Sequence, residues 1–199
     1  MKIVCVSGGS YKSFYLNHFA KIKHCDLLIF NFGIIYDYVV KDELLDYGVV
    51  TKELLSLSNS LKAVVVAGVN VVQNGKTVKS LIVSDGEKIY LSTLKLGVKV
   101  CLNESLDEQQ YESNLRLKHK KAHSTTNRVH IHNNQFVVGC KTTDFGGCNK
   151  IVFTEQKIKP NTAHCNPNKI YIFCNKFGVN VVKNKQNLEY NYKVSIIRI

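Results

Sequence analysis

Features that mark several special protein classes are missing from this sequence of 199 residues. No apolar run approaches the ~18 residues that a helix needs to span a bilayer. The opening MKIVCVSGG leads directly into an apolar stretch, without the basic start, apolar core and small-residue cleavage site of a signal peptide. We therefore expect a cytoplasmic protein with no membrane segment.

Arginine is scarce in a strongly basic chain. The net charge is +12, yet only three of the 27 basic residues are arginines, at positions 116, 128 and 198. Base reading and bidentate phosphate contacts favour arginine over lysine. The lysines are scattered, and their densest cluster is Lys118, Lys120 and Lys121. This pattern indicates a compositional bias toward lysine and asparagine, so nucleic acid is an unlikely partner.

The seven cysteines contain no C-x-x-C pair, at positions 5, 25, 101, 140, 148, 165 and 174. An odd number at irregular spacing in a reducing compartment indicates free thiols rather than a disulfide framework. His130-x-His132 and His164-Cys165 are the best local candidates for metal ligands. Such pairs are more often exposed on the surface or hydrogen-bonded within the protein than bound to a metal. We therefore expect no metal and no cofactor.

The length and composition predict a single domain over residues 1–199, with a core of ordinary size. Apolar strands and amphipathic helices alternate in the first third as β-α-β-α-β, which implies a sheet with helices packed on it. Ser10 and Thr51 are the expected helix caps. The segments are Lys2–Ser7, a helix after Ser10 up to His24, Asp26–Phe32, a helix after Thr51 and Ala63–Val69.

No helix separates the next strands, which follow Ala63–Val69. Asn74-Gly75 is a strong hairpin signal, and Asp85-Gly86 makes a second turn. Thr126–Asn134 has a helix-like pattern. Late strands are expected at Gln135–Thr142, Asn149–Thr154, Lys169–Asn175, Gly178–Lys183 and Tyr192–Ile199. The result is an α/β chain with mixed sheets.

The stretch Leu96–Glu108, LGVKVCLNESLDE, is the most informative part of the chain. It reads as a strand that ends on Cys101, followed by a helix start with Ser105 and Glu108 in capping-box spacing. The helix dipole there favours a thiolate, as a nucleophile requires. The alternative is that Cys101 packs as a small hydrophobic residue.

Several pieces in order resemble the nitrilase, or carbon-nitrogen hydrolase, superfamily. They are CDLLIFNF, KELLSLSNSLKAVVVAGVN, NGKTVKSLIVSDGEKIYLSTLKL, GVKVCLN, and NRVHIHNNQFVVGC with GGCNKIVF, and they cover nearly all of residues 1–155. The resemblance implies a four-layer α-β-β-α sandwich with mixed sheets. It also implies hydrolysis or transfer of amides and nitriles by a cysteine nucleophile, a glutamate base and a lysine that stabilises negative charge.

Carried over by position, the resemblance places the nucleophile at Cys101 but leaves the other two roles unfilled. The glutamate position falls on Phe32, and a phenyl ring cannot accept a proton. The lysine position falls on Thr93 or Ser92, with Lys95 two residues further on as a candidate substitute. The loops around Cys101 are also shorter than is usual in the family. The chain is thus expected to be a shortened, degenerate member.

Three functions compete. The first is a nitrilase-like protein without the family's amidase activity, acting through binding or assembly. The second is a cysteine-dependent amide hydrolase with a rebuilt site around Cys101. Its base would come from Glu104, His130 or His132 and its cation from Lys95 or Lys99. A basic binding module, with its lysines gathered on one face, is the third.

Three structural expectations follow. Mid-strand residues should be buried in a two-sheet sandwich, namely Val4, Leu28, Val65, Val100 and Val137. Phe32 should pack near Cys101 and make that site apolar. By resemblance, a homodimer should form through a capped helix Leu106–Arg116 and a helix Thr126–Asn134, weakened by repulsion between the lysines of the intervening segment.

Overall fold

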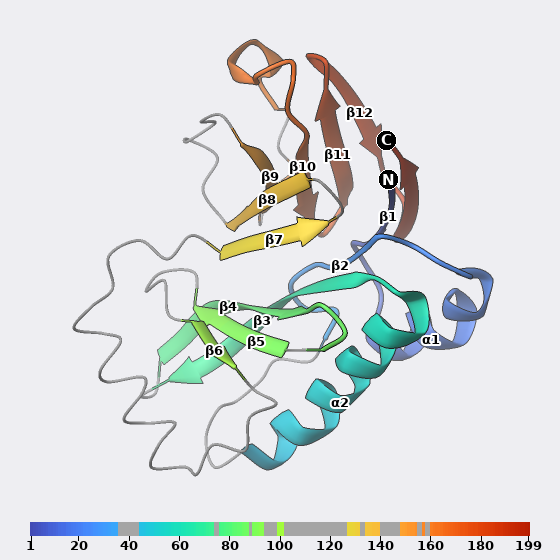
Figure 1. The fold of residues 1–199 in the computed structure, drawn as a ribbon, viewed down its shortest axis with the longest axis vertical. Helices are drawn as coiled ribbons and strands as arrows, with labels where there is room; N and C mark the ends of the chain where they lie inside the picture. Colours follow the sequence, from blue (N-terminus) through green and yellow to red (C-terminus); the bar gives the residue numbers. More distant parts are fainter. Residues whose placement is uncertain are drawn as a thin grey trace.

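Two β-sheets pack face to face in the computed structural model (Figure 1), which describes residues 1–35, 44–73, 76–87, 89–93, 99–101, 127–131, 134–139, 148–154, 157 and 160–199. In these residues the first sheet has seven strands, in the order β13-β1-β2-β3-β4-β5-β6. The second has six, in the order β12-β11-β10-β9-β8-β7.

The strands of the first sheet are β1 (Lys2–Val6), β2 (Leu27–Phe30), β3 (Val64–Gln73), β4 (Lys76–Ser84), β5 (Ile89–Thr93), β6 (Lys99–Cys101) and β13 (Val194–Arg198). Those of the second are β7 (Asn127–Ile131), β8 (Asn134–Gly139), β9 (Asn149–Phe153), β10 (Tyr171–Asn175), β11 (Gly178–Lys183) and β12 (Gln186–Tyr190). Both sheets are mixed, as expected. Neighbours β1, β2 and β3 are parallel, as are β8, β9 and β10, and the other pairs are antiparallel.

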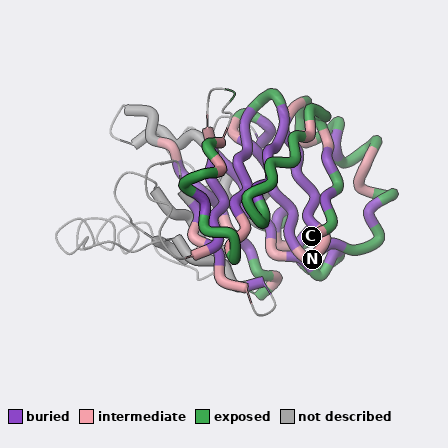
Figure 2. Tube along the Cα trace, turned by 90° about the horizontal axis from the view of Figure 1, so that it is seen from above, coloured by how far each residue is buried: buried purple, intermediate pink, exposed green. Residues whose placement is uncertain are grey.

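The interior strands are buried on both faces because the sheet has a core on each side (Figure 2). In β1, Ile3 and Cys5 point toward the second sheet, whereas Val4 and Val6 point toward the helices. Of the residues expected in the core, Val4, Leu28 and Val65 are buried and Val137 is half-buried. The side chain of Val100 lies outside the described part.

Two helices cover the outer face of the first sheet, α1 (Tyr11–Asn17) and α2 (Leu44–Leu61). As predicted, Ser10 caps α1: its hydroxyl oxygen accepts a hydrogen bond of 3.2 Å from the Ser13 N–H. A short 3-10 helix, η1 (Phe19–Lys21), follows. No described helix is long and apolar enough to cross a membrane.

A small apolar cluster lies on the outer face of the second sheet, formed by Val152, Cys165, Tyr171, Phe173 and Val182. Cys165 joins it from the segment 160–170, which contains the 3-10 helix η2 (Thr162–His164). In the described residues this short turn is the only helical structure between β9 and β10.

Two helix predictions were wrong. Thr51 is not a cap, because α2 begins at Leu44 and Thr51 lies inside it. The helix-like run Thr126–Asn134 instead contains β7 and the start of β8, which pair antiparallel. Ile131 is 3% exposed in the core between the sheets, and this long-range burial decides the conformation of a short apolar run. The expected interface helix Leu106–Arg116 lies outside the described residues.

One strand, β12, has no apolar pattern and was missed. Its residues are mostly exposed because it is an edge strand. Asn184 and Lys185 connect it to β11 with φ values of 51° and 61°. Positive φ at both central residues matches a two-residue type I′ hairpin turn, for which asparagine is a common first residue. Asn184 was therefore the available signal.

Candidate functional site

Cys101, the expected nucleophile, is the last residue of β6, at one edge of the first sheet. Its backbone is in register with Tyr90 of β5. Lys99 lies in the same strand and His130 lies in β7. The other candidates, Lys95, Glu104 and His132, lie outside the described residues. The structure therefore gives the strand of Cys101 but does not test the proposed side-chain set.

Phe32, at the expected base position, follows β2 and packs among apolar groups. Its ring makes an edge contact with Phe153 of the second sheet, with ring centroids 5.5 Å apart and planes at 75°. On β3, a Cβ added to Gly68 would lie 3.0 Å from Phe32 Cγ, so this glycine leaves the room that the ring occupies. The ring at the expected base position is thus enclosed by residues of both sheets.

Whether Phe32 packs near Cys101 stays a prediction. In the first sheet β3, β4 and β5 lie between β2 and β6. The side chain of Cys101 lies outside the described part of the chain.

Lys79 lies beside Phe32 at the expected base position, and the sequence analysis missed it. Its Nζ lies 5.2 Å from the centroid of the Phe32 ring, a cation–π contact. Lys79, Leu81 and Val83 are every second residue of β4, so their side chains share one face of the strand. Leu81 and Val83 belong to the core between the sheets. That period of two was the available signal. A cation therefore lies beside the ring of the residue at the expected base position.

Two buried cysteines, Cys5 and Cys174, meet between the sheets. The sulfur atoms of Cys5 in β1 and Cys174 in β10 lie 3.7 Å apart and share a hydrogen bond, and both residues are completely buried. This bond lowers the pKa of Cys5, and together with burial it raises the pKa of Cys174 well above the ordinary value. Both cysteines are free rather than disulfide-bonded, and their contact joins the two sheets.

We expect the buried cysteines to resist alkylation in the folded protein. Cys5, Cys25, Cys165 and Cys174 are buried, and desolvation raises the pKa of Cys25 to about 11, so little thiolate is present near neutral pH. Of the five cysteines whose side chains are described, only Cys148 is partly exposed, and it should be alkylated before the other four. Mass spectrometry of iodoacetamide-treated protein, native and unfolded, gives the order. Equal labelling of Cys174 and Cys148 in native protein would contradict this arrangement.

No cluster of metal-ligating side chains occurs in the described part of the chain. His164 is exposed and its neighbour Cys165 is buried against the second sheet, so this sequence pair does not converge. His24 Nε2 lies 3.3 Å from an Asp26 carboxylate oxygen, and no third ligating side chain among the described residues joins this pair.

No protein-family model matches the sequence, and no curated protein is similar to it in sequence. Solved structures do match the fold over nearly the whole chain. A CN-hydrolase superfamily protein from Xanthomonas campestris, with an arsenic adduct in its active site, has a TM-score of 0.56 at 10% identity, covering 100% of this chain and 90% of its own. An amidase from Nesterenkonia has a TM-score of 0.60 at 11% identity, with coverages of 98% and 91%.

A glutamine-dependent NAD⁺ synthetase from Cytophaga hutchinsonii also matches, with a TM-score of 0.54 at 12% identity over 99% of this chain and 42% of its own. At these identities the likeness concerns the fold. The chain therefore has the α/β sandwich fold of the nitrilase, or CN-hydrolase, superfamily, as the resemblance predicted.

Proposed function

We propose that this protein uses the nitrilase fold without the amide hydrolysis of the superfamily and acts by binding. The observation that supports this proposal most strongly is the ring of Phe32 at the base position, packed against Phe153 and the surface of Gly68. A phenyl ring has no proton acceptor, and a positioned base contributes about 10²- to 10⁴-fold in rate.

A single substitution at position 32 would not supply an effective base. A glutamate at position 32 would enter a space bounded by Phe153 and would lie beside Lys79. The two opposite charges would favour each other, which stabilises the carboxylate and makes it a weaker base. The positions expected for the lysine carry Ser92 or Thr93, neither of which is a cation.

We expect the purified protein to release no ammonia from primary amides above the buffer rate. L-Glutamine, L-asparagine and short aliphatic amides cover the simplest substrates, and a coupled ammonia assay measures the rate. The reason is the absence of the base, together with the loss of the charge-stabilising lysine, which costs about a further 10²-fold or more. Phe32→Glu should not restore activity, because Lys79 would pair with the new carboxylate.

The matched controls are Cys101→Ala and Cys148→Ala. Ammonia release that disappears in the first variant and persists in the second would contradict the proposal. That result would establish the alternative, a cysteine-dependent amide hydrolase with a rebuilt site. Its base would then be sought by substituting Glu104, His130 and His132 in turn.

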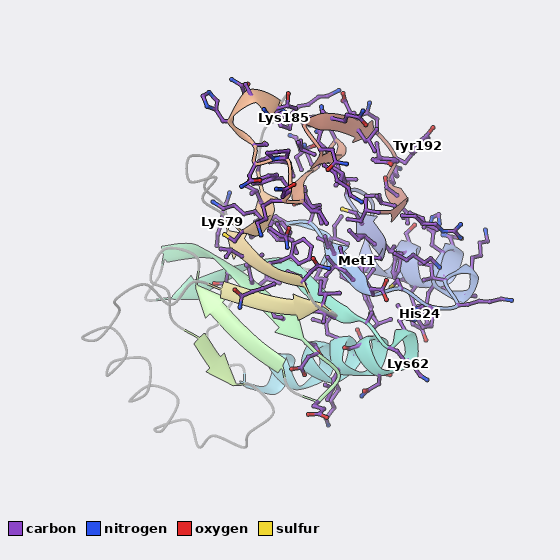
Figure 3. The ribbon with its side chains drawn as sticks, turned by 45° about the horizontal axis from the view of Figure 1, so that its top comes forward. Met1, His24, Lys62, Lys79, Lys185 and Tyr192 are labelled. Carbon is purple, nitrogen blue, oxygen red and sulfur yellow. The ribbon has the colours of Figure 1, made fainter. Side chains whose placement is uncertain are left out.

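The placement of two described lysines does not favour a basic binding module. Figure 3 shows Lys62 beside α2 and Lys185 at the opposite end of the molecule, next to the second sheet. A nucleic-acid interface would need such side chains on one face. The homodimer and the cytoplasmic location stay predictions. The dimer's proposed surface at Thr126–Asn134 would now have to be a β-hairpin.

A further inference from the structure

A groove of about 530 Å³ runs between α1 and α2, on the outer side of the first sheet. It is separated by that sheet from Phe32 and the core between the sheets. Leu57, which is 3% exposed, is the buried residue of its α2 wall. The size falls within the ~300–1,000 Å³ of small-molecule sites, which are mostly apolar with a few convergent polar groups.

Aromatic rings form the α1 side of the groove. The rings of Tyr15 and Phe19 stack, with centroids 4.9 Å apart and planes at 10°. Tyr11 lies 6.3 Å from Tyr15 in a tilted arrangement. Tyr15 remains 49% exposed, so part of its ring surface is open to another aromatic group. The chain thus offers a stacking platform that its own residues leave partly uncovered.

Opposite charges stand on the two walls. Lys12 lines the groove from α1 and Glu53 lines it from α2, and within the described part neither forms a salt bridge. Burial raises the pKa of the Tyr11 hydroxyl and the Glu53 carboxylate raises it further, which places that carboxylate near the aromatic wall. The hydroxyls of Ser56 and Ser60 lie along the same wall as Glu53.

We propose that this groove binds a small aromatic zwitterion of the amino-acid type. Its ring stacks on Tyr15, its carboxylate contacts Lys12 and its ammonium group contacts Glu53. An uncharged aromatic ligand would leave both charges unused, and an anion or a cation alone would face one of them unfavourably. This inference goes beyond the function proposed above and does not depend on it.

L-Tryptophan is the probe, because the chain contains no tryptophan and the ligand's emission is observed without protein background. Titrating the full chain into L-tryptophan should give a saturable change in anisotropy with Kd about 1 mM, as expected for a small ligand in an open groove. Tyr15→Ala should weaken binding about fivefold. Tyr192→Ala, which removes a 70% exposed tyrosine elsewhere, should leave it unchanged.

Two analogues of L-tryptophan test the roles of Lys12 and Glu53 separately. Tryptamine lacks the carboxylate and indole-3-propionate lacks the ammonium group. Lys12→Gln should weaken L-tryptophan and indole-3-propionate about threefold but not tryptamine, and Glu53→Gln should weaken L-tryptophan and tryptamine but not indole-3-propionate. Lys183→Gln, an exposed lysine of β11, is the charge control. No saturable binding by folded protein, equal effects of the controls, or equal effects on all three ligands would overturn the proposal.

Discussion

Replacing Phe30 with alanine should lower the free energy of unfolding by about 4 kcal/mol. Phe30 is completely buried in β2 and belongs to the core between the first sheet and its helices. Its ring makes a T-shaped contact with Phe14 of α1, with centroids 5.2 Å apart, and lies 5.7 Å from Tyr11. Removing it leaves a cavity that neither the sheet nor α1 can close without losing other contacts.

Urea unfolding followed by circular dichroism measures this change. Phe177→Ala is the matched control, since Phe177 is 51% exposed in the turn between β10 and β11 and should change the free energy by at most about 1 kcal/mol. Similar losses for the two variants would show that α1 does not pack on β2 as described.

Replacing Gly178 with alanine should lower the free energy of unfolding by about 3 kcal/mol. Gly178 begins β11, and a Cβ added there would lie far inside van der Waals contact with the Tyr190 carbonyl oxygen of β12. The obstacle is backbone, which cannot rotate away as a side chain can. To accommodate the methyl group, β12 would have to separate from β11 where Val179 pairs with Tyr190.

Gly8→Ala serves as the control for this prediction. The nearest atom to a Cβ at that position is Lys193 Cγ at 3.4 Å, an ordinary contact with a flexible side chain. Thermal unfolding should show a large decrease in melting temperature for Gly178→Ala. For Gly8→Ala the free energy of unfolding should change by no more than about 0.5 kcal/mol. An unchanged melting temperature for Gly178→Ala would mean that β12 is not held against β11.

Local signals predicted the first half of the fold well. Continuous apolar runs such as Lys2–Val6 and Leu27–Phe30 are typical of strands covered on both faces, and both are interior strands. The Asn74-Gly75 signal predicted the hairpin of β3 and β4, which pair from Val65 with Ser84 to Gln73 with Lys76. In these elements the local preference and the long-range contacts agree.

The failures share one physical cause. Whether Val129 and Ile131 lie on a helix or a strand depends on their pairing with β8, which a short apolar run does not reveal. The contact of Lys79 with Phe32 likewise depends on which strands become neighbours. A family resemblance transfers residue identities along the chain, but strand order is set by pairings between distant segments.

The pairing of β1 with β13 bears on how the chain folds. Lys2 pairs with Arg198 and Val6 with Val194, so β1 finds one of its two neighbours about 190 residues away, at a correspondingly high loop-closure entropy. Until β13 arrives, β1 has an unpaired row of N–H and C=O groups beside an apolar face. During synthesis or refolding that row can accept the β13 strand of another copy, which would produce domain-swapped oligomers. Dilute refolding conditions, or a chaperone that shields this edge, should therefore decide the yield of correctly closed monomer.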